Sequence, residues 1–226
     1  MKRFLNRREA GMELAEKLSR FAGRDDVVVL GLARGGVPVA FEVARSLRVP
    51  LDVFVVRKLG APGHEEFAIG AIASGGVRVL NTEAIQLLGM TEAAIERETR
   101  RELQELERRE REYRDNRPPA NVKGRTVLVV DDGLATGATM QAAITALRKQ
   151  QPAEIIVAAP VVAADTCRNL RTTADDCVYV RSPEPFYGVG LWYVDFSPTS
   201  DDEVRSLLEI AARKPAPIKP HREFQY

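Results

Sequence analysis

The residues best suited to chemistry stand together in a short segment, DDGLATGAT, at positions 131–139. A glycine-rich turn that leads into a helix exposes backbone N–H groups and the positive end of the helix dipole, which suit a phosphate dianion. Gly137 allows close approach of the backbone, and the two threonine hydroxyls add donors. Asp131 and Asp132 would repel such a phosphate, but they can accept hydrogen bonds from vicinal hydroxyls of a sugar that carries it. The segment therefore predicts a site for a phosphorylated sugar.

Other phosphate-binding loops fit the segment less well. A Walker A loop requires a lysine directly before its Ser or Thr, whereas Ala138 precedes Thr139. A dinucleotide-binding fingerprint requires glycines spaced as G-x-G-x-x-G, which this segment lacks. A simple aspartate cap of a helix would explain one acid, but not the acids, glycines and threonines together. P-loop hydrolysis and dinucleotide binding are therefore disfavoured.

Two further segments place glycines and cations after predicted strands. In GLARGGVP, Gly35 and Gly36 would expose backbone N–H groups to an anion, with Arg34 beside them. In VVRK, Arg57 and Lys58 end an apolar run, where ligands of parallel sheets bind. A solvated basic turn is the alternative interpretation of this pair.

The elements that must position these residues follow the rhythm of an α/β fold, a parallel twisted sheet flanked by helices. Short apolar, β-branched runs suit strands that are buried on both faces. The predicted strands cover residues 27–32, 51–56, 126–130, 154–159 and 178–180. The predicted helices cover residues 1–24, 35–47, 138–149, 163–170 and 200–212.

The middle of the chain departs from this rhythm. Residues 67–73 and 77–80 predict a hairpin, and residues 59–67 before it predict a loop that closes over a substrate, with His64 as an ordinary loop residue. Residues 91–117 form a densely charged predicted helix within an apparent insertion over about 82–118. Its arginines are open to two interpretations, a nucleic-acid patch or a solvated or subunit-contact helix, and the interleaved glutamates favour the second. They are Arg100, Arg101, Arg108, Arg109 and Arg111.

Composition limits the class of protein. The 226 residues are 45% apolar and 29% charged, and 33 basic against 32 acidic side chains give a net charge of +1. This balance gives no electrostatic reason to expect general nucleic-acid binding. We expect no membrane span and no secretory signal, and a cytoplasmic protein in which Cys167 and Cys177 are reduced structural thiols.

The strand and loop VLVVDDGLATGAT resemble the phosphoribosyl diphosphate (PRPP) loop of the type I phosphoribosyltransferases: a hydrophobic strand, two acids, a spacer and Thr-Gly-x-Thr. The resemblance implies that Asp131 and Asp132 hold the ribose and act in catalysis. It also implies that Arg34, Gly35 and Gly36 bind the diphosphate and that Arg57 and Lys58 are catalytic cations. The loop that would bind the 5-phosphate consists of Gly133, Leu134, Ala135, Thr136, Gly137, Ala138 and Thr139.

Near the C-terminus, FYGVGLWYVDF resembles the base-binding segment of hypoxanthine-guanine phosphoribosyltransferases. This resemblance implies a purine-like acceptor that stacks on an aromatic side chain, with Tyr187, Trp192 and Tyr193 as candidates beside Phe186. It also makes Asp195 a candidate metal ligand. A packed hydrophobic strand is the alternative for this segment.

Taken together, the resemblance implies transfer of the 5-phosphoribosyl group from PRPP to a nitrogenous base, with Mg²⁺ and release of diphosphate. It also implies a homodimer. The chain would be one domain over residues 1–213, with a small hood at about 183–200 and a mobile tail at 214–226. Two other functions stay open: a regulator that binds PRPP or a nucleotide without efficient transfer, and phosphorolysis or hydrolysis of a nucleotide at the same site.

Overall fold

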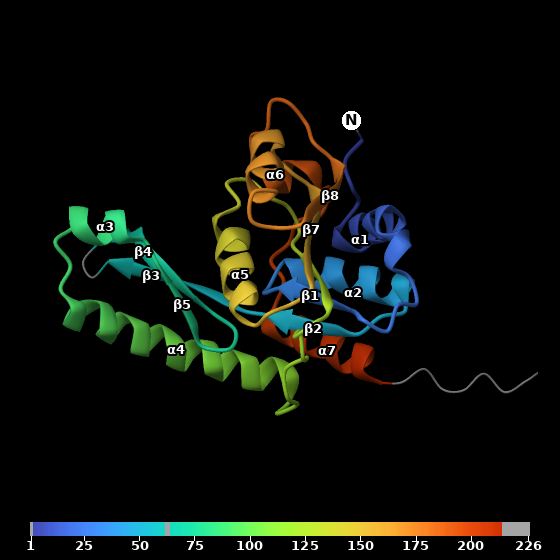
Figure 1. Cartoon of the computed structure of the whole chain (residues 1–226). Coiled ribbons are helices and arrows are strands. Elements are labelled where there is room, and N and C mark those ends of the chain that lie inside the picture. The colour runs from blue at the N-terminus through green and yellow to red at the C-terminus, as the bar shows by residue number, and fades with distance from the viewer. Residues whose placement is uncertain (1, 62–63, 214–226) are drawn as a thin grey trace, which may run out of the picture.

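The main sheet has five parallel strands in the order β2-β1-β6-β7-β8 (Figure 1). The computed structural model describes residues 2–61 and 64–213, with no side chains described for residues 64–66. The strands are β1 Val27–Leu32, β2 Leu51–Phe54, β6 Thr126–Val130, β7 Glu154–Val161 and β8 Asp176–Arg181. These bounds confirm the predicted α/β fold with a parallel sheet, and each predicted strand is present with small shifts at its ends.

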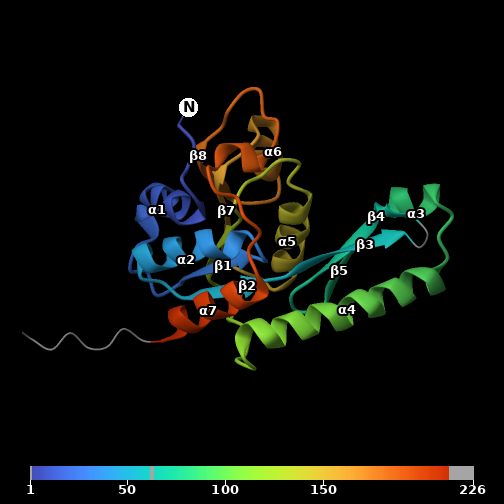
Figure 2. The same ribbon diagram turned by 180° about the vertical axis from the view of Figure 1, so that it is seen from behind.

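Helices cover both faces of this sheet because neighbouring residues of a strand point to opposite sides. Val27 and Val29 of β1 pack with the N-terminal helices and α2, whereas Val28 and Leu30 pack with α5 and α6. Helix α7 lies against α2 and β2 at one edge (Figure 2). The helices are α1 Arg7–Lys17, η1 Ser19–Phe21, α2 Gly36–Leu47, α5 Ala138–Lys149, α6 Ala164–Leu170 and α7 Asp201–Ala212.

A second unit projects from the edge of the sheet as an arm (Figures 1 and 2). Its three antiparallel strands have the order β3-β4-β5 and are followed by two helices. Its elements are β3 Val56–Ala61, β4 His64–Ala73, β5 Val77–Leu80, α3 Thr82–Leu87 and α4 Glu92–Arg114. Leu59, Ile69 and Ile72 of the hairpin pack with Ile95 and Leu106 of α4, so the thin apolar stripe of the charged helix is buried.

A buried ion pair fixes the base of the arm. The Arg114 guanidinium, at the end of α4, donates to Asp52 of β2 at 2.9 Å and to the carbonyl of Val53 at 2.8 Å. Its side chain is 7% exposed, and Asp52 also accepts from the Ala120 N–H at 2.7 Å. The end of α4 is therefore held against the main sheet by a hydrogen-bonded buried charge.

The structure corrects two predictions and leaves one outside its range. Residues 59–61 and 64–67, predicted as a closing loop, belong to the paired strands β3 and β4. Cys167 and Cys177, predicted to be reduced, form a disulfide between α6 and β8 with a Cα–Cα distance of 5.9 Å. The predicted mobile tail, 214–226, lies outside the described residues. Among those residues, every helix is too short or too polar to cross a bilayer.

Candidate active site

The predicted phosphate loop connects β6 to α5, as the sequence indicated. Gly137 caps α5 with a φ of +74°, and a side chain there would place its Cβ 2.6 Å from the Thr166 methyl carbon, so glycine is required on both counts. Leu134 lies between β7 and α6, since its N–H donates to Val161 at 2.9 Å and its carbonyl accepts from Ala163 at 2.9 Å. Thr166 also donates to the carbonyl of Ala135. The turn is thus fixed from behind.

On its open side, the loop presents the first turn of α5. Thr136, Ala138 and Thr139 are exposed, as a phosphate-binding surface requires. The helix that follows has twelve residues, and no side chain caps its N-terminus. Its first N–H groups therefore remain available to an anion.

Asp131 and Asp132 stand side by side where β6 ends, and both are half-buried. The backbone N–H of Asp132 donates to Oδ1 of Asp131 at 2.9 Å. Burial, followed by the charge of Asp132, raises the pKa of Asp131 well above its ordinary value. Burial also raises the pKa of Asp132. Two neighbouring carboxylates with raised pKa values are ready to receive hydrogen-bond donors or a cation.

Arg7 is the cation that the rest of the chain supplies to this pair. It lies in the first turn of α1, 125 residues from Asp132, and donates to Oδ2 of Asp132 through Nε at 2.9 Å and Nη2 at 2.8 Å. The remaining Nη1 donates to the Ser197 carbonyl at 2.7 Å, and the guanidinium lies 4.1 Å from the Phe196 ring centroid. Its charge lowers the pKa of Asp132 and so opposes the effect of burial. The sequence held no local signal for this contact.

The predicted diphosphate loop meets the acidic pair directly. A Cβ on Gly36 would lie 2.5 Å from the carbonyl oxygen of Val130 and 2.9 Å from Cα of Asp131. A Cβ on Gly35 would clash with the Asp132 carboxylate. Both glycines are therefore required by close packing of the loops after β1 and β6. Arg34 is exposed at its guanidinium, with Nη1 3.9 Å from Asp201 of α7.

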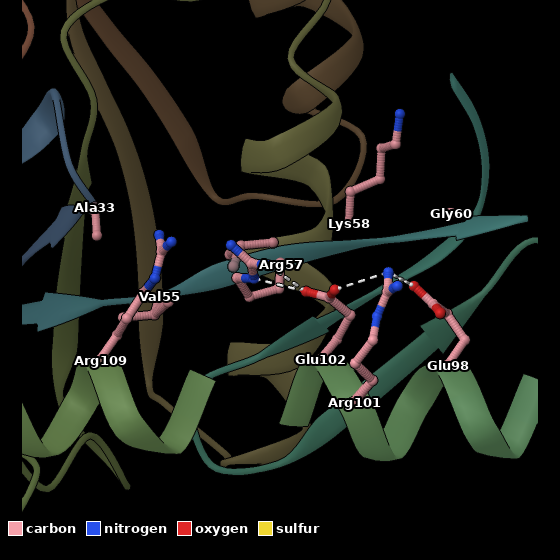
Figure 3. A pocket seen from close by; sticks show the side chains of 10 residues that line it. Ala33, Val55, Arg57, Lys58, Gly60, Glu98, Arg101, Glu102 and Arg109 are labelled. Atoms are coloured by element: carbon pink, nitrogen blue, oxygen red, sulfur yellow. Dashed lines mark hydrogen bonds and ion pairs between the residues drawn. The ribbon is translucent and has the colours of Figure 1, made fainter. Parts of the chain in front are cut away.

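Arg57 and Lys58 do not act as one pair, because adjacent residues of β3 point to opposite faces (Figure 3). Arg57 points toward α4 and binds Glu102 through Nη2 at 2.6 Å and Nε at 2.7 Å. Lys58 points away from α4 (Figure 3). The prediction that both cations face the crevice together is thus replaced by one cation on each face of the hairpin.

The C-terminal aromatic segment contacts the acidic pair through Tyr193. Tyr193 is 2% exposed, its hydroxyl donates to the carbonyl of Asp132 at 2.5 Å, and its ring lies 5.4 Å from that of Phe4 and 5.0 Å from that of Phe196. Tyr193 therefore supports the site from within the protein. Tyr187 is 80% exposed and Trp192 is half-buried, so these rings are the ones open to a ligand.

Asp195, the candidate metal ligand, lies at the surface of the hood. Its carboxylate accepts from the N–H and the hydroxyl of Ser197 at 2.9 and 2.6 Å, and these bonds lower its pKa. The described part of the chain contains no group of three or more His, Cys, Asp or Glu side chains that could hold a metal by itself. A metal at this site would therefore take most of its ligands from the substrate.

Comparison with known proteins agrees with the fold. The model of the phosphoribosyl transferase domain family matches residues 2–186, and the chain belongs to this family. The predicted family and fold are thereby confirmed. The TT1426 protein of Thermus thermophilus, a crystal structure, is 44% identical, with a TM-score of 0.81 over 93% of this chain and 100% of that one.

Two relatives from Mycobacterium tuberculosis, strains CDC 1551 and H37Rv, carry provisional phosphoribosyl transferase names. Each is 45% identical over 213 residues, which is 94% of this chain and 48% of the relative. The chain thus spans about half the length of the curated relatives it matches.

Proposed function

We propose that the chain transfers the 5-phosphoribosyl group of PRPP to a nitrogenous base, with a purine-like acceptor, and releases diphosphate. The observation that carries this proposal is the half-buried acidic pair at the start of an open phosphate loop. A phosphate on the first turn of α5 would place the attached ribose next to Asp131 and Asp132, whose carboxylates accept from its hydroxyls.

In the transfer, the bond between C1 of ribose and the diphosphate oxygen breaks, and the leaving diphosphate takes the electron pair. A nitrogen of the base forms the new bond to C1 and loses its proton. Positive charge develops on the sugar in between, and Asp131 and Asp132 would stabilise it from a site with little water. Arg34 and Arg57 would offset the charge of the diphosphate, with the N–H groups around Gly35 and Gly36 as donors. Lys58, on the other face of the hairpin, stays a proposed catalytic cation that would act from that side.

Mg²⁺ is the metal that the family implies, and the described residues would supply only a minority of its ligands. Mg²⁺ takes oxygen ligands and keeps several waters, so the diphosphate and ribose hydroxyls of PRPP would supply most of its coordination. Asp195 remains a proposed ligand of the metal. When bound, the metal would neutralise the diphosphate as it leaves.

The acceptor would stack in the hood. Tyr187 and Trp192 are the proposed base-binding rings, and the indole Nε1 of Trp192 is buried with no hydrogen-bond partner in the described residues. Tyr193 contributes by supporting Asp132. We also propose a cytoplasmic homodimer, and analytical ultracentrifugation of the purified chain would check the dimer.

The test is isothermal titration with PRPP and Mg²⁺, followed by a panel of free bases with diphosphate release monitored. We expect PRPP to bind and one purine-like base to trigger release. Binding without release for any base would indicate a regulator that binds PRPP. No binding of PRPP would contradict the assignment of residues 131–139.

A further inference from the structure

The charged helix α4 faces β3 and Ala33 across a cavity of about 270 Å³ (Figure 3). Ala33, directly before the diphosphate loop, and Val55, directly after β2, form its inner wall. Three guanidinium groups enter it from two elements. They are those of Arg57 on β3 and of Arg101 and Arg109 on α4.

The guanidinium groups of Arg57 and Arg101 are connected by carboxylates (Figure 3). Glu102 accepts from Arg57 at 2.6 Å and from Arg101 at 3.3 Å, and Arg101 also donates to Glu98 at 2.6 Å. Both glutamates are buried, Glu102 at 6% and Glu98 at 8% exposure. Buried carboxylates hold Arg57 and Arg101 in place: without Arg101, Glu98 would be an unpaired buried charge, and without Arg57, Glu102 would keep only its longer contact of 3.3 Å to Arg101.

This network leaves donors free for a ligand. Among the hydrogen bonds between described residues, Arg57 uses Nε and Nη2, Arg101 uses Nη2, and Arg109 uses Nε toward Glu105. Each guanidinium therefore keeps N–H groups that can bind an anion, and its planar fork suits phosphate oxygens.

A fourth guanidinium extends the row toward the diphosphate loop. Nη1 of Arg34 lies 3.9 Å from the Asp201 carboxylate of α7, which also accepts a hydrogen bond from the hydroxyl of Tyr113 on α4. Asp201 therefore connects Arg34 to α4 at Tyr113, one helical turn from Arg109. The row runs from the loop after β1 along the inner side of α4.

We propose that α4 forms the outer wall of the diphosphate site, with Arg101 and Arg109 as binding residues for the diphosphate of PRPP. This inference rests on the proposed function. The cavity lies at the small end of ligand-binding pockets, which reach roughly 300–1,000 Å³, and so suits a compact anion or one part of a larger ligand. In the free protein, Glu98 and Glu102 keep Arg57 and Arg101 in place until the diphosphate engages their remaining donors.

The proposal also accounts for the charge pattern of α4. A helix that only covered the hairpin would need its apolar stripe and a solvated face. Here two of its glutamates are buried beneath the arginines, on the side that faces β3. Arg97 and Arg100, on the same helix, lie outside the cavity.

The test compares the double variant R101Q/R109Q with the matched control R97Q/R100Q, which removes the same charge from the same helix. Calorimetric titration would measure affinity for the magnesium salt of inorganic diphosphate and, separately, for ribose 5-phosphate. We expect diphosphate affinity to fall about 30-fold in R101Q/R109Q, as loss of charge-assisted hydrogen bonds implies. Ribose 5-phosphate affinity should stay unchanged, which shows that the variant is folded. R101K/R109K, which keeps the charge without the fork, should lie between the variant and the wild type.

A loss of less than about fivefold, or an equal loss in the control, would overturn the inference. The proposed function fails separately. A wild-type protein that binds diphosphate but neither PRPP nor ribose 5-phosphate would contradict the transferase, while the R101Q/R109Q effect would still stand. A wild-type protein that binds PRPP and tolerates R101Q/R109Q would keep the transferase and remove α4 from its site.

Discussion

The acidic pair after β6 and the ion network of the arm handle buried charge in opposite ways. Asp131 and Asp132 are like charges placed side by side, and only Arg7 among the described cations donates to them. In the arm, charges alternate: Arg57, Glu102 and Arg101 follow one another within hydrogen-bonding distance. The first arrangement raises the pKa values of its acids, whereas the second satisfies its carboxylates.

The acidic pair is a site whose charge is balanced only when a ligand binds, whereas the charges of the ion network in the arm already balance one another. A buried like-charge pair costs folding free energy, and it persists where binding or catalysis benefits from it. A balanced network costs less, and it holds the arm together before any ligand arrives. Removal of charge should therefore leave the free energy of unfolding unchanged or raise it at the acidic pair, and lower it in the arm. The following predictions test this difference.

The largest effect should come from the acidic pair. In Asp131→Asn with Asp132→Asn, PRPP affinity should fall at least about a thousandfold, because two charge-assisted acceptors for ribose hydroxyls are lost. The free energy of unfolding at pH 7 should stay the same or rise, because the neutral amides avoid the cost of ionised buried carboxylates. Calorimetry with PRPP and Mg²⁺ and urea unfolding would measure both.

The matched control for this variant is Asp165→Asn with Asp202→Asn. Both of these carboxylates are 83% exposed and form only short-range surface pairs, so affinity and stability should change little. Unchanged PRPP affinity in the Asp131 and Asp132 variant would remove the ribose site from this loop.

The base of the arm should respond in the opposite direction. Arg114→Met removes a buried guanidinium and leaves Asp52 without its partner, so the free energy of unfolding should fall by about 3 kcal/mol. Ribose 5-phosphate affinity should not change, because the phosphate loop is fixed from α6 and β7. Arg108→Met, on the exposed face of α4, should cost less than about 1 kcal/mol in urea unfolding. Equal costs for both variants would mean that Asp52 and Arg114 do not anchor the arm.

The sequence predicted the strand, the acidic pair and the turn because these parts follow one another within residues 126–149. The contacts of Val161, Ala163 and Thr166 that hold the turn come from more distant parts of the chain and could not be predicted in the same way. The arm was harder to predict. Its hairpin pairs β3 with β4 where the glycine and proline residues indicated a loop, and its charged helix gave no sign of which partner its arginines would find.

Long-range contacts account for the other differences. Arg7 reaches Asp132 across 125 residues, and its position in the first helix resembles that of any surface arginine. Cys167 and Cys177 are only 10 residues apart in the chain, but the turn between α6 and β8 had to bring them together before a disulfide could be predicted. The expected compartment and the number of cysteines, on which the prediction of reduced thiols was based, contain no information about the distance between the two side chains.

Arg7 should set the pH range of PRPP binding. Burial raises the pKa values of Asp131 and Asp132, so the folded protein binds protons more tightly than the unfolded chain does. Their contribution to stability therefore falls as pH rises from the ordinary value through the raised pKa, while the ionised form that receives ribose appears over the same window. PRPP affinity should decrease on acidification, and Arg7→Gln should move that decrease to higher pH.

At neutral pH, Arg7→Gln should weaken PRPP binding about tenfold, and Arg7→Lys should recover part of the loss because it keeps the charge. The other charged or ionisable groups that act on this part of the site include Asp131, Tyr193, Arg181 and Asp195, and all four remain in the variants. Titration of PRPP affinity from acid to neutral pH would measure the shift. If the pH dependence of PRPP affinity stays unchanged and only stability falls, Arg7 has a structural role alone, through its hydrogen bond to the Ser197 carbonyl.

The smallest effect should come from Tyr193→Phe, which removes one hydroxyl from the support of the acidic pair. The carbonyl of Asp132 loses the bond from Tyr193, and the free energy of unfolding should fall by about 1 kcal/mol, or roughly 2–4 °C in the melting temperature. The ring keeps its packing against Phe4 and Phe196, so PRPP and base affinities should stay within about threefold of the wild type. Tyr187→Phe, at an exposed ring, is the control and should leave the melting temperature unchanged. A loss of base affinity in Tyr193→Phe with no change in stability would show that the Tyr193 hydroxyl contacts the acceptor. The aromatic segment would then be part of the ligand site, like the acidic pair, and not a structural support like the ion network of the arm.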